Sequence, residues 1–285
     1  MPDSTGRAGR PFKEHRLVVE GIIYRYRAGI PWRDLPEHFG SWKTVWKRHR
    51  RYAADGTWDS VLATLLGHAE SRGLIDWEVS VDSTINRAHQ HGTNLPRHTG
   101  GPSNYKNLLE EPPDHAIGKS RGGLTTKIHS LVDGNQRPLV VMVGPGQAGD
   151  SPMFENLLGA LKVKNPATGA TRRRPVRAMA DKAYSSRGNR KYLRERGIQC
   201  VIPEKDDQKA NRKRKGSAGG RPVTYDKEAY KRRNVVERSF NALKQWRGMA
   251  TRYDKLALTY RSAVVLHAVV IWSAALEKSR LGDTP

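Results

Sequence analysis

The spacing of apolar side chains divides the chain into a helical N-terminal part and a longer mixed part. In the first part, apolar residues recur at helical spacing, and Gly29, Gly40 and Ser41 provide stop and start signals. This pattern predicts helices over residues 12–27, 31–39, 41–54 and 57–71. We therefore expect a small all-α domain over residues 1–75.

From residue 76 onward, apolar and polar positions alternate as in β-strands, and helical segments lie between the later strands. Strands are predicted over residues 78–85, 124–132, 138–143, 176–180 and 198–202, and helices over 151–162, 186–196, 227–248 and 257–276. The turn Asp133-Gly134-Asn135 joins the second and third strands as a hairpin. Three antiparallel strands followed by helix–strand crossovers are typical of a ribonuclease-H-like sheet.

The predicted fold is thus α/β: a ribonuclease-H-like mixed sheet with flanking helices, preceded by a helix-turn-helix-like all-α domain. The catalytic domain is expected over residues 76–256, and a C-terminal helix within 257–285 is expected to pack on it. Residues 86–123 are rich in Gly, Pro, His and Asn, and residues 205–221 are basic and end in small residues. Both segments are predicted to be flexible loops.

The charge of the chain indicates a polyanionic partner. The 285 residues include 51 Lys and Arg against 28 Asp and Glu, a net charge of +23. Most of the surplus lies in residues 171–261, whereas an incidental basic composition would be spread along the chain. The apolar stretch 263–272 is too short to span a bilayer, and the N-terminus lacks the apolar core of a secretory signal. The single cysteine, Cys200, fits a reducing cytosol, so we expect a cytoplasmic protein that is not associated with a membrane.

The predicted helix over residues 41–54 is strongly basic and contains no acidic residue. A helix, a tight turn and a basic helix follow one another, as in helix-turn-helix DNA readers. An ordinary helical bundle with a basic exposed face would show the same pattern. The candidate DNA contacts are Lys43, Lys47, Arg48, Arg50 and Arg51.

Three acidic residues fall where this topology would place a metal site. Asp82 lies in the first strand, Asp181 ends the fourth strand, and Glu237 lies in the helix that follows the basic loop. The first and fourth strands are neighbours in a ribonuclease-H-like sheet, so the first two carboxylates can converge. Oxygen ligands without cysteine suit Mg²⁺, or Mn²⁺ in its place. Two such ions can activate a nucleophile and stabilise the leaving oxygen of a phosphodiester.

The helix that carries Glu237 presents further candidate residues. Tyr230, Arg233, Glu237 and Lys244 fall within an arc of roughly 60° on an ideal helix. Arg233 and Glu237 also have the spacing of an ordinary i, i+4 ion pair. Lys244 lies too far along the helix for that pair, about 10 Å from Glu237, and its position suits a phosphate farther along a bound strand.

This spacing resembles the Y-x2-R-x3-E-x6-K signature of DDE transposases of bacterial insertion sequences. Other segments are similar to the insertion-sequence-five family in particular: PWRDLPEHFGSWKTVWKRHRRYAADG near the N-terminus, VDSTINRAHQHG at 81–92, GGLTTKIH at 122–129, PGQAGD at 145–150, DKAYSSRGNRKYLRERGI at 181–198 and RNVVERSFNALKQWR at 233–247. The resemblance covers nearly the whole chain. It implies that Asp82, Asp181 and Glu237 form a catalytic, metal-binding DDE triad.

The expected function is therefore that of a transposase. It would bind terminal inverted repeats, cleave DNA with two Mg²⁺ ions and transfer the freed 3′ ends to target DNA. Tyr230, Arg233 and Lys244 would contact the cleaved strand, and the basic loop would attract DNA through Lys213, Arg214 and Lys215. The partner is double-stranded DNA, and joining two ends requires a homodimer or larger synaptic complex.

Two other functions remain open on the sequence alone. A regulator could occupy the repeats through residues 12–54 without chemistry, although an intact triad argues against it. A ribonuclease-H-like nuclease acting on hybrids or junctions would share the carboxylates but would need no end-specific domain.

Overall fold

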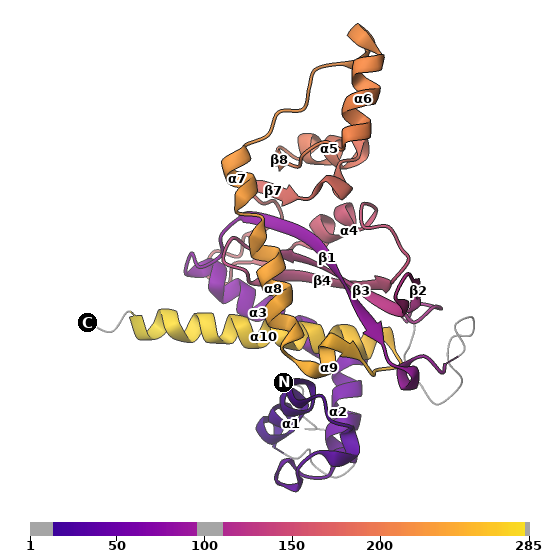
Figure 1. The fold of residues 1–285 in the computed structure, drawn as a ribbon. Helices are drawn as coiled ribbons and strands as arrows, with labels where there is room; N and C mark the ends of the chain where they lie inside the picture. The colour runs from indigo at the N-terminus through magenta and orange to yellow at the C-terminus, as the bar shows by residue number, and fades with distance from the viewer. Residues whose placement is uncertain (1–13, 96–110, 283–285) are drawn as a thin grey trace.

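The computed structural model describes residues 14–95 and 111–282 (Figure 1). Its α-helices are α1 (His15–Ala28), α2 (Trp42–Ala54), α3 (Thr57–Ser71), α4 (Met153–Ala160), α5 (Arg187–Glu195), α6 (Asp206–Arg214), α7 (Lys227–Lys231), α8 (Asn234–Lys244), α9 (Arg247–Ala250) and α10 (Ala257–Gly282). Its short 3₁₀ helices are η1 (Trp32–Asp34), η2 (Glu37–Phe39), η3 (Gln90–Gly92), η4 (Lys182–Tyr184) and η5 (Gly216–Gly219). Its strands are β1 (Glu78–Ala88), β2 (Gly118–Ser120), β3 (Gly123–Val132), β4 (Pro138–Pro145), β5 (Val163–Lys164), β6 (Thr171–Arg172), β7 (Arg177–Ala180), β8 (Gln199–Val201) and β9 (Thr251–Arg252).

A mixed sheet forms the centre of the molecule. Strands β2, β3, β1, β7 and β8 lie side by side in that order, β4 also pairs with β3, and β9 pairs with the end of β1. The β1–β3 and β3–β4 pairs are antiparallel, whereas β1–β7 and β7–β8 are parallel. The predicted order of three antiparallel strands followed by parallel crossovers, and with it the ribonuclease-H-like α/β class, is confirmed.

Helix α8 covers the sheet beside its central strand. Its apolar stripe of Val236, Phe240 and Leu243 is buried, and the helix packs against β1 and β3. Burying such side chains stabilises the docked helix by about 1.5–3 kcal/mol each. The adjoining stripe of α8 thereby lies along β1, where Arg233 contacts Asp82 and Lys244 contacts the Ile85 carbonyl.

The N-terminal helices pack on the long C-terminal helix. Helix α10 contacts α2, α3 and β4, and α1 packs against α9 (Figure 1). At the α1–α9 contact, Gly29 has a φ of 73°, and a Cβ there would collide with the side chain of Arg247. A Cβ at Gly248 would lie 3.1 Å from the carbonyl oxygen of Tyr26, so the backbones are close there too. Residues 75 and 76, between which the sequence analysis places a domain boundary, lie in the connection between α3 and β1.

Buried charge is concentrated at this junction. The Arg25 guanidinium lies over the rings of Tyr26 and Trp32, at 4.5 and 5.0 Å, and 3.6 Å from the carboxylate of Asp254. Both members of this ion pair are only 5% exposed at their side chains. Burial of the neighbouring His49 lowers its pKa to about 4.

Helix α10 is long and apolar enough to cross a membrane by length and composition alone. However, 67% of its apolar window is buried inside the protein, as expected of a core helix.

Some predicted segments have other bounds or another conformation in the structure. The helix expected over 227–248 is divided into α7, α8 and α9. The first break coincides with ion pairs that draw Arg232 to Glu78 and Arg233 to Asp82 on β1. The second break follows Lys244, where Trp246 leaves the helical conformation and is buried.

The segment 205–221 is also not a flexible loop, because most of it forms α6 and η5. Acidic residues occupy the first turn of α6 and basic residues its last turn, which favours a helix through its dipole.

Within 86–123, β1 continues to Ala88 because β9 pairs with its last residues, and β2 forms at 118–120. Residues 96–110 of that predicted loop, and the predicted helix start at residue 12, lie outside the described residues.

Candidate active site

Two acidic residues lie at the same level on adjacent strands. The parallel register of β1 and β7 pairs Val81 with Ala180, and Asp82 and Asp181 follow these two residues. Asp82 accepts the Ser83 backbone N–H at 2.8 Å, and Asp181 accepts the Ala183 backbone N–H at 2.8 Å. The structure therefore brings together the two aspartates that the topology predicted as neighbours.

The environment of Asp82 disfavours its charge. Burial is the main cause that raises the pKa of Asp82, and the negative charge of Asp181 acts in the same direction. The Ser83 N–H and the Arg233 guanidinium oppose this shift but do not cancel it. A cation bound between the two aspartates would stabilise the charged form of Asp82. It would thereby offset both the burial and the repulsion from Asp181.

Arg233 links the third acidic residue to the first. Its Nη1 donates to Asp82 Oδ2 at 3.0 Å, and its Nη2 donates to Glu237 Oε1 at 2.5 Å. Burial alone would lower the pKa of Arg233, but the two carboxylates outweigh it and raise the pKa. The predicted i, i+4 pair is present, and the same guanidinium also lies between Asp82 and Glu237.

This arrangement limits direct contact among the three carboxylates. Within residues 14–95 and 111–282, no three His, Cys, Asp or Glu side chains form a group that could hold a metal ion. The side chain of Glu237 is 49% exposed. The guanidinium occupies the position at which a cation shared by Asp82 and Glu237 would bind.

A second polar network, which the sequence analysis did not predict, supports β1 behind the carboxylates. Ser83 Oγ donates to Asp150 Oδ1 at 2.7 Å, and Lys127 Nζ donates to the same oxygen at 2.9 Å. These hydrogen bonds lower the pKa of Asp150 although burial opposes them. Tyr184 is buried next to this network, and its pKa is raised by burial and by Asp82, Asp150 and Asp181. The motif GGLTTKIH contains Lys127, and the motif PGQAGD contains Asp150. These two motifs are the sequence signal from which the network could have been predicted.

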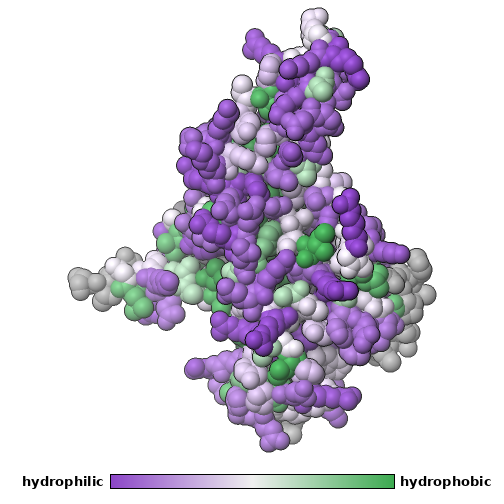
Figure 2. All heavy atoms as spheres, in the orientation of Figure 1, coloured by the Kyte–Doolittle hydropathy of each residue, from purple (hydrophilic) through white to green (hydrophobic). Residues whose placement is uncertain are grey.

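Tyr230 on α7 and Lys244 at the end of α8 extend the site on either side of Glu237. The ring of Tyr230 lies 5.7 Å from the Arg233 guanidinium and 5.6 Å from the ring of Tyr225. Lys244 Nζ donates to the Ile85 carbonyl at 3.4 Å, and burial lowers the pKa of Lys244. Figure 2 shows hydrophilic side chains gathered over this face of the molecule.

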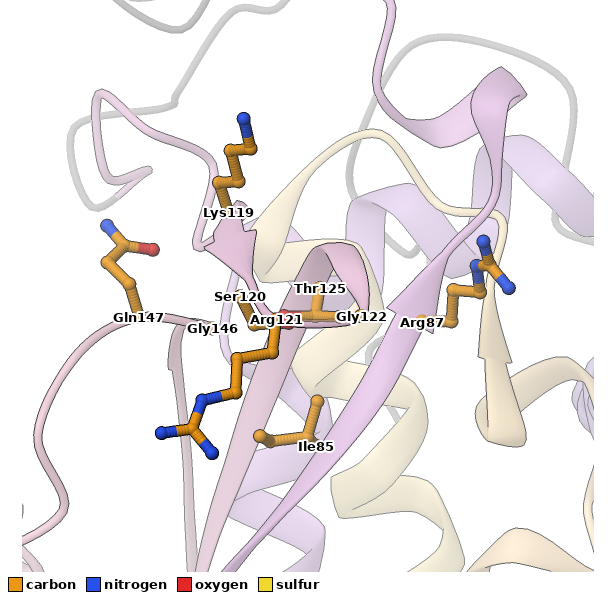
Figure 3. A pocket seen from close by; sticks show the side chains of 9 residues that line it. All are labelled: Ile85, Arg87, Lys119, Ser120, Arg121, Gly122, Thr125, Gly146 and Gln147. Carbon is orange, nitrogen blue, oxygen red and sulfur yellow. The ribbon is translucent and has the colours of Figure 1, made fainter.

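A cleft of about 640 Å³ begins where Lys244 reaches β1. It is lined by Ile85 and Arg87 on β1, by the β2–β3 turn and by the end of β4 (Figure 3). Lys119 on β2, Arg121 on the β2–β3 turn and Arg87 on β1 make it basic. Ile85 is 47% exposed, so the floor of the cleft is partly apolar.

The basic residues of α2 occupy different environments. Lys43 and Lys47 are exposed, Arg50 lies 4.9 Å over the Trp46 ring, and Arg51 lies 3.8 Å from Asp55. Arg48 is only 7% exposed, and its Nη1 donates to the Tyr52 hydroxyl at 3.3 Å. The structure does not support Arg48 as a DNA contact, because α2 turns this side chain toward α1.

The remaining predicted DNA contacts lie far from α2 along the molecule. Lys213 and Arg214 are exposed at the end of α6, and Lys215 follows them. Arg214 also donates to Asn211 at 2.8 Å within the helix.

Comparison with protein families identifies the class to which this fold and site belong. Residues 75–271 match the family "Transposase DDE domain", and residues 1–62 match "Putative transposase of IS4/5 family". The chain belongs to the DDE transposases of insertion sequences, and the resemblance seen in the sequence is confirmed. Members of this family cleave DNA and use divalent metal ions.

Individual proteins show similarity over parts of the chain. The "Putative transposase for insertion sequence element IS6501" of Brucella ovis is 30% identical over 149 residues, which are 52% of this chain and 98% of that protein. "Uncharacterized protein y4sN" of Sinorhizobium fredii is 36% identical over 101 residues, which are 35% of this chain and 77% of that protein. The pre-cleavage Mos1 transpososome structure covers 95% of this chain and 81% of its own at 12% identity. Its TM-score of 0.29 is too low to support any argument about the present site.

Proposed function

We propose that Asp82, Asp181 and Glu237 are the catalytic, metal-binding triad that cleaves the element ends. Hydrolysis of a phosphodiester there would free a 3′-hydroxyl, and this hydroxyl would attack target DNA. The observation that carries the proposal is the β1–β7 register, which sets Asp82 beside Asp181, together with the link from Asp82 to Glu237 through Arg233.

The side chains of the triad suit Mg²⁺ or Mn²⁺. All three offer hard carboxylate oxygens, and burial of Asp82 next to Asp181 already favours a bound cation over two free charges. Two Mg²⁺ ions would supply a Lewis acid for the attacking and leaving oxygens. Glu237 can join only when Arg233 releases it, and a DNA phosphate offers this guanidinium another acceptor. DNA binding would thus make the carboxylates available.

The remaining residues of the site would hold the DNA strand. Arg233 and Tyr230 lie on one side of Glu237, and Lys244 lies on the other, next to Ile85. Contacts on both sides of the scissile phosphate would fix its position, and small misplacements at such a centre are costly in rate.

The N-terminal helices would recognise the terminal repeat. Lys43 and Lys47 expose their ammonium groups on α2, and Arg50 and Arg51 lie on the same helix. We assign end recognition to residues 1–75, catalysis to 76–256 and a supporting role to the helix within 257–285. Two or more copies would join the two element ends, in the bacterial cytoplasm and at the nucleoid.

A cleavage assay tests the triad. The full-length protein should cut a duplex that carries an element end in Mg²⁺ or Mn²⁺ but not in EDTA. Asp82→Ala, Asp181→Ala and Glu237→Ala should each reduce cleavage below detection while DNA affinity is retained. The exposed Asp207→Ala is the matched control and should cleave normally.

The same assay can contradict the proposal. Cleavage by the Asp181→Ala protein would remove that residue from the mechanism. End binding without cleavage by the unmodified chain would indicate a regulator, and cleavage without preference for the end would indicate a nuclease.

Lys244 gives a finer test of strand positioning. Lys244→Ala should slow single-turnover cleavage of prebound DNA roughly tenfold or more, because it removes one contact that positions the strand. Affinity should change less than the rate. A loss of affinity with an unchanged rate would mean that Lys244 contributes only to binding.

A further inference from the structure

A second basic cleft lies outside the carboxylate site, between α5 and α6. It has a volume of about 510 Å³, and η5 and the chain leading to Val223 close its far side. Glu204 is the one acidic residue among those that line it. Its basic lining residues are Arg187, Arg190, Arg194, Arg212, Lys215 and Arg221.

The walls of this cleft are fixed by specific contacts. Gln208 of α6 donates to the Ser185 carbonyl at 2.5 Å and accepts the Ser185 hydroxyl at 2.7 Å. Arg190 of α5 donates to the same hydroxyl at 3.1 Å. A Cβ at Gly219 would collide with the carbonyl oxygen of Arg212, so η5 lies directly against α6. The cleft therefore has a defined shape, which these hydrogen bonds and close contacts maintain.

Most of its cations face solvent. Arg190 donates to main-chain carbonyls, and Arg212 pairs with Glu204. The side chains of Arg187, Arg194 and Arg221 are exposed, and none of them has an ion pair or hydrogen bond among the described residues. Several unpaired guanidinium groups around one cleft repel one another unless an anion binds, and guanidinium groups match phosphate oxygens in geometry.

The position of the cleft relative to the carboxylates indicates which anion it binds. Ser185, which lines the cleft, follows Asp181 by four residues through η4. In Figure 1, α6 lies at one end of the molecule, α1 and α2 lie at the other, and β1 and α8 lie between them. The cleft and α2 are thus on opposite sides of the carboxylates.

We infer that the α5–α6 cleft binds the phosphate backbone of duplex DNA on the side of the scissile phosphate away from the terminal repeat. This inference rests on the proposed function for the position of the scissile phosphate. DNA on that side is the donor flank before cleavage and target DNA during strand transfer. Both present the same phosphate backbone to the cleft.

Equilibrium binding without metal tests the inference in the full-length protein. The cleft variant is Arg187→Gln, Arg194→Gln and Arg221→Gln together. The control, Lys162→Gln, Lys278→Gln and Arg280→Gln, removes the same charge from exposed positions elsewhere. Two duplexes are compared: one ends at the cleavage point, and the other continues into about 20 base pairs of flank, roughly two helical turns.

The cleft variant should bind the flanked duplex at least about tenfold more weakly at physiological salt, with a salt slope flatter by two to three. The affinity of the cleft variant for the unflanked duplex should change much less. The affinity of the control variant for either duplex should also change much less. An equal loss on both duplexes, or an equal loss in the control, would overturn the inference. Unfolding temperatures equal to that of the unmodified chain establish that each variant is folded.

A second arm separates the two sources of DNA. A random-sequence duplex is added to protein bound to a precleaved end, and its capture is measured. Loss of flank binding supports a donor-flank contact, loss of capture supports a target contact, and loss of neither overturns the inference. Because no step requires cleavage, an inactive unmodified chain would disprove the proposed chemistry and leave this measurement intact.

Discussion

Two regions that contain basic helices, the N-terminal helices and the α5–α6 region, place their cationic side chains in opposite environments. At the N-terminal helices, Arg25 is buried against Tyr26 and Trp32, and Arg48 is buried against Tyr52. In α6 no residue is buried, and polar contacts such as Gln208–Ser185 hold the helix to its neighbours.

The difference shows that the density of positive charge does not determine how a helix is used. Helix α2 has an apolar face that includes Val45, His49 and Tyr52, so it docks and takes some of its cations into the interior. Helix α6 lacks such a face, so its cations other than Arg212 remain exposed. The aliphatic part of a Lys or Arg side chain adds packing where an apolar surface is available. Where no such surface is present, the side chain contributes only its charge.

The largest expected contrast between the regions is in stability. Arg25→Ala leaves Asp254 buried without its partner and should lower the free energy of unfolding by about 3 kcal/mol. Arg214→Ala in α6 should change it by less than about 0.5 kcal/mol, because this side chain is exposed. Urea denaturation measures both, and equal effects would contradict the contrast.

The next contrast is in pH dependence. Burial holds the pKa of His49 near 4 in the folded protein, whereas an unfolded histidine titrates near 6.5. As pH falls from 6.5 toward 4, the unfolded chain gains a proton first, so stability is lost over this range. Each such histidine should cost on the order of 1–2 kcal/mol between pH 7 and 5.

Burial also lowers the pKa of His129 and of His267 to about 4. Helix α6 contains no histidine. His49→Gln should therefore reduce the loss of stability to urea between pH 7 and pH 5. An unchanged pH dependence would mean that His49 is already charged, or exposed, in the folded protein.

The smallest expected contrast is in DNA affinity. Lys43→Gln with Lys47→Gln should reduce the preference for an element end over random duplex. Neutralising Lys213, Arg214 and Lys215 should weaken binding to flanked ends and random duplex alike, with a salt slope flatter by about one per lost phosphate contact. Titrations across a salt series measure both, and a reversed outcome would exchange the two roles.

Much of the sheet could be predicted because its signals are local. Alternation marks β1 and β3, Asp133 and the residues after it form the hairpin turn, and Ser186 caps α5 by accepting the Asn189 N–H. The strand order then placed Asp82 beside Asp181 without knowledge of any contact.

The parts that could not be predicted depend on distant partners. The break before α8 coincides with the Arg233–Asp82 contact, whose residues lie 151 positions apart. The Ser83–Asp150 hydrogen bond spans 67 positions. Arg48 has the spacing of a surface cation on α2, and only the packing of α1 against that face turns it inward.

The close contact of Gly29 with Arg247, and of Gly248 with Tyr26, has a mechanical consequence. At both glycines α1 and α9 approach each other closely, so we expect the N-terminal helices and the carboxylates to move as one body. On the proposed function, such a body fixes the distance between α2 and the carboxylates. This distance sets the number of base pairs between the recognised sequence and the cut. A terminal sequence of another length would have to bend or twist to be cut, and the cost of that deformation would fall on the DNA.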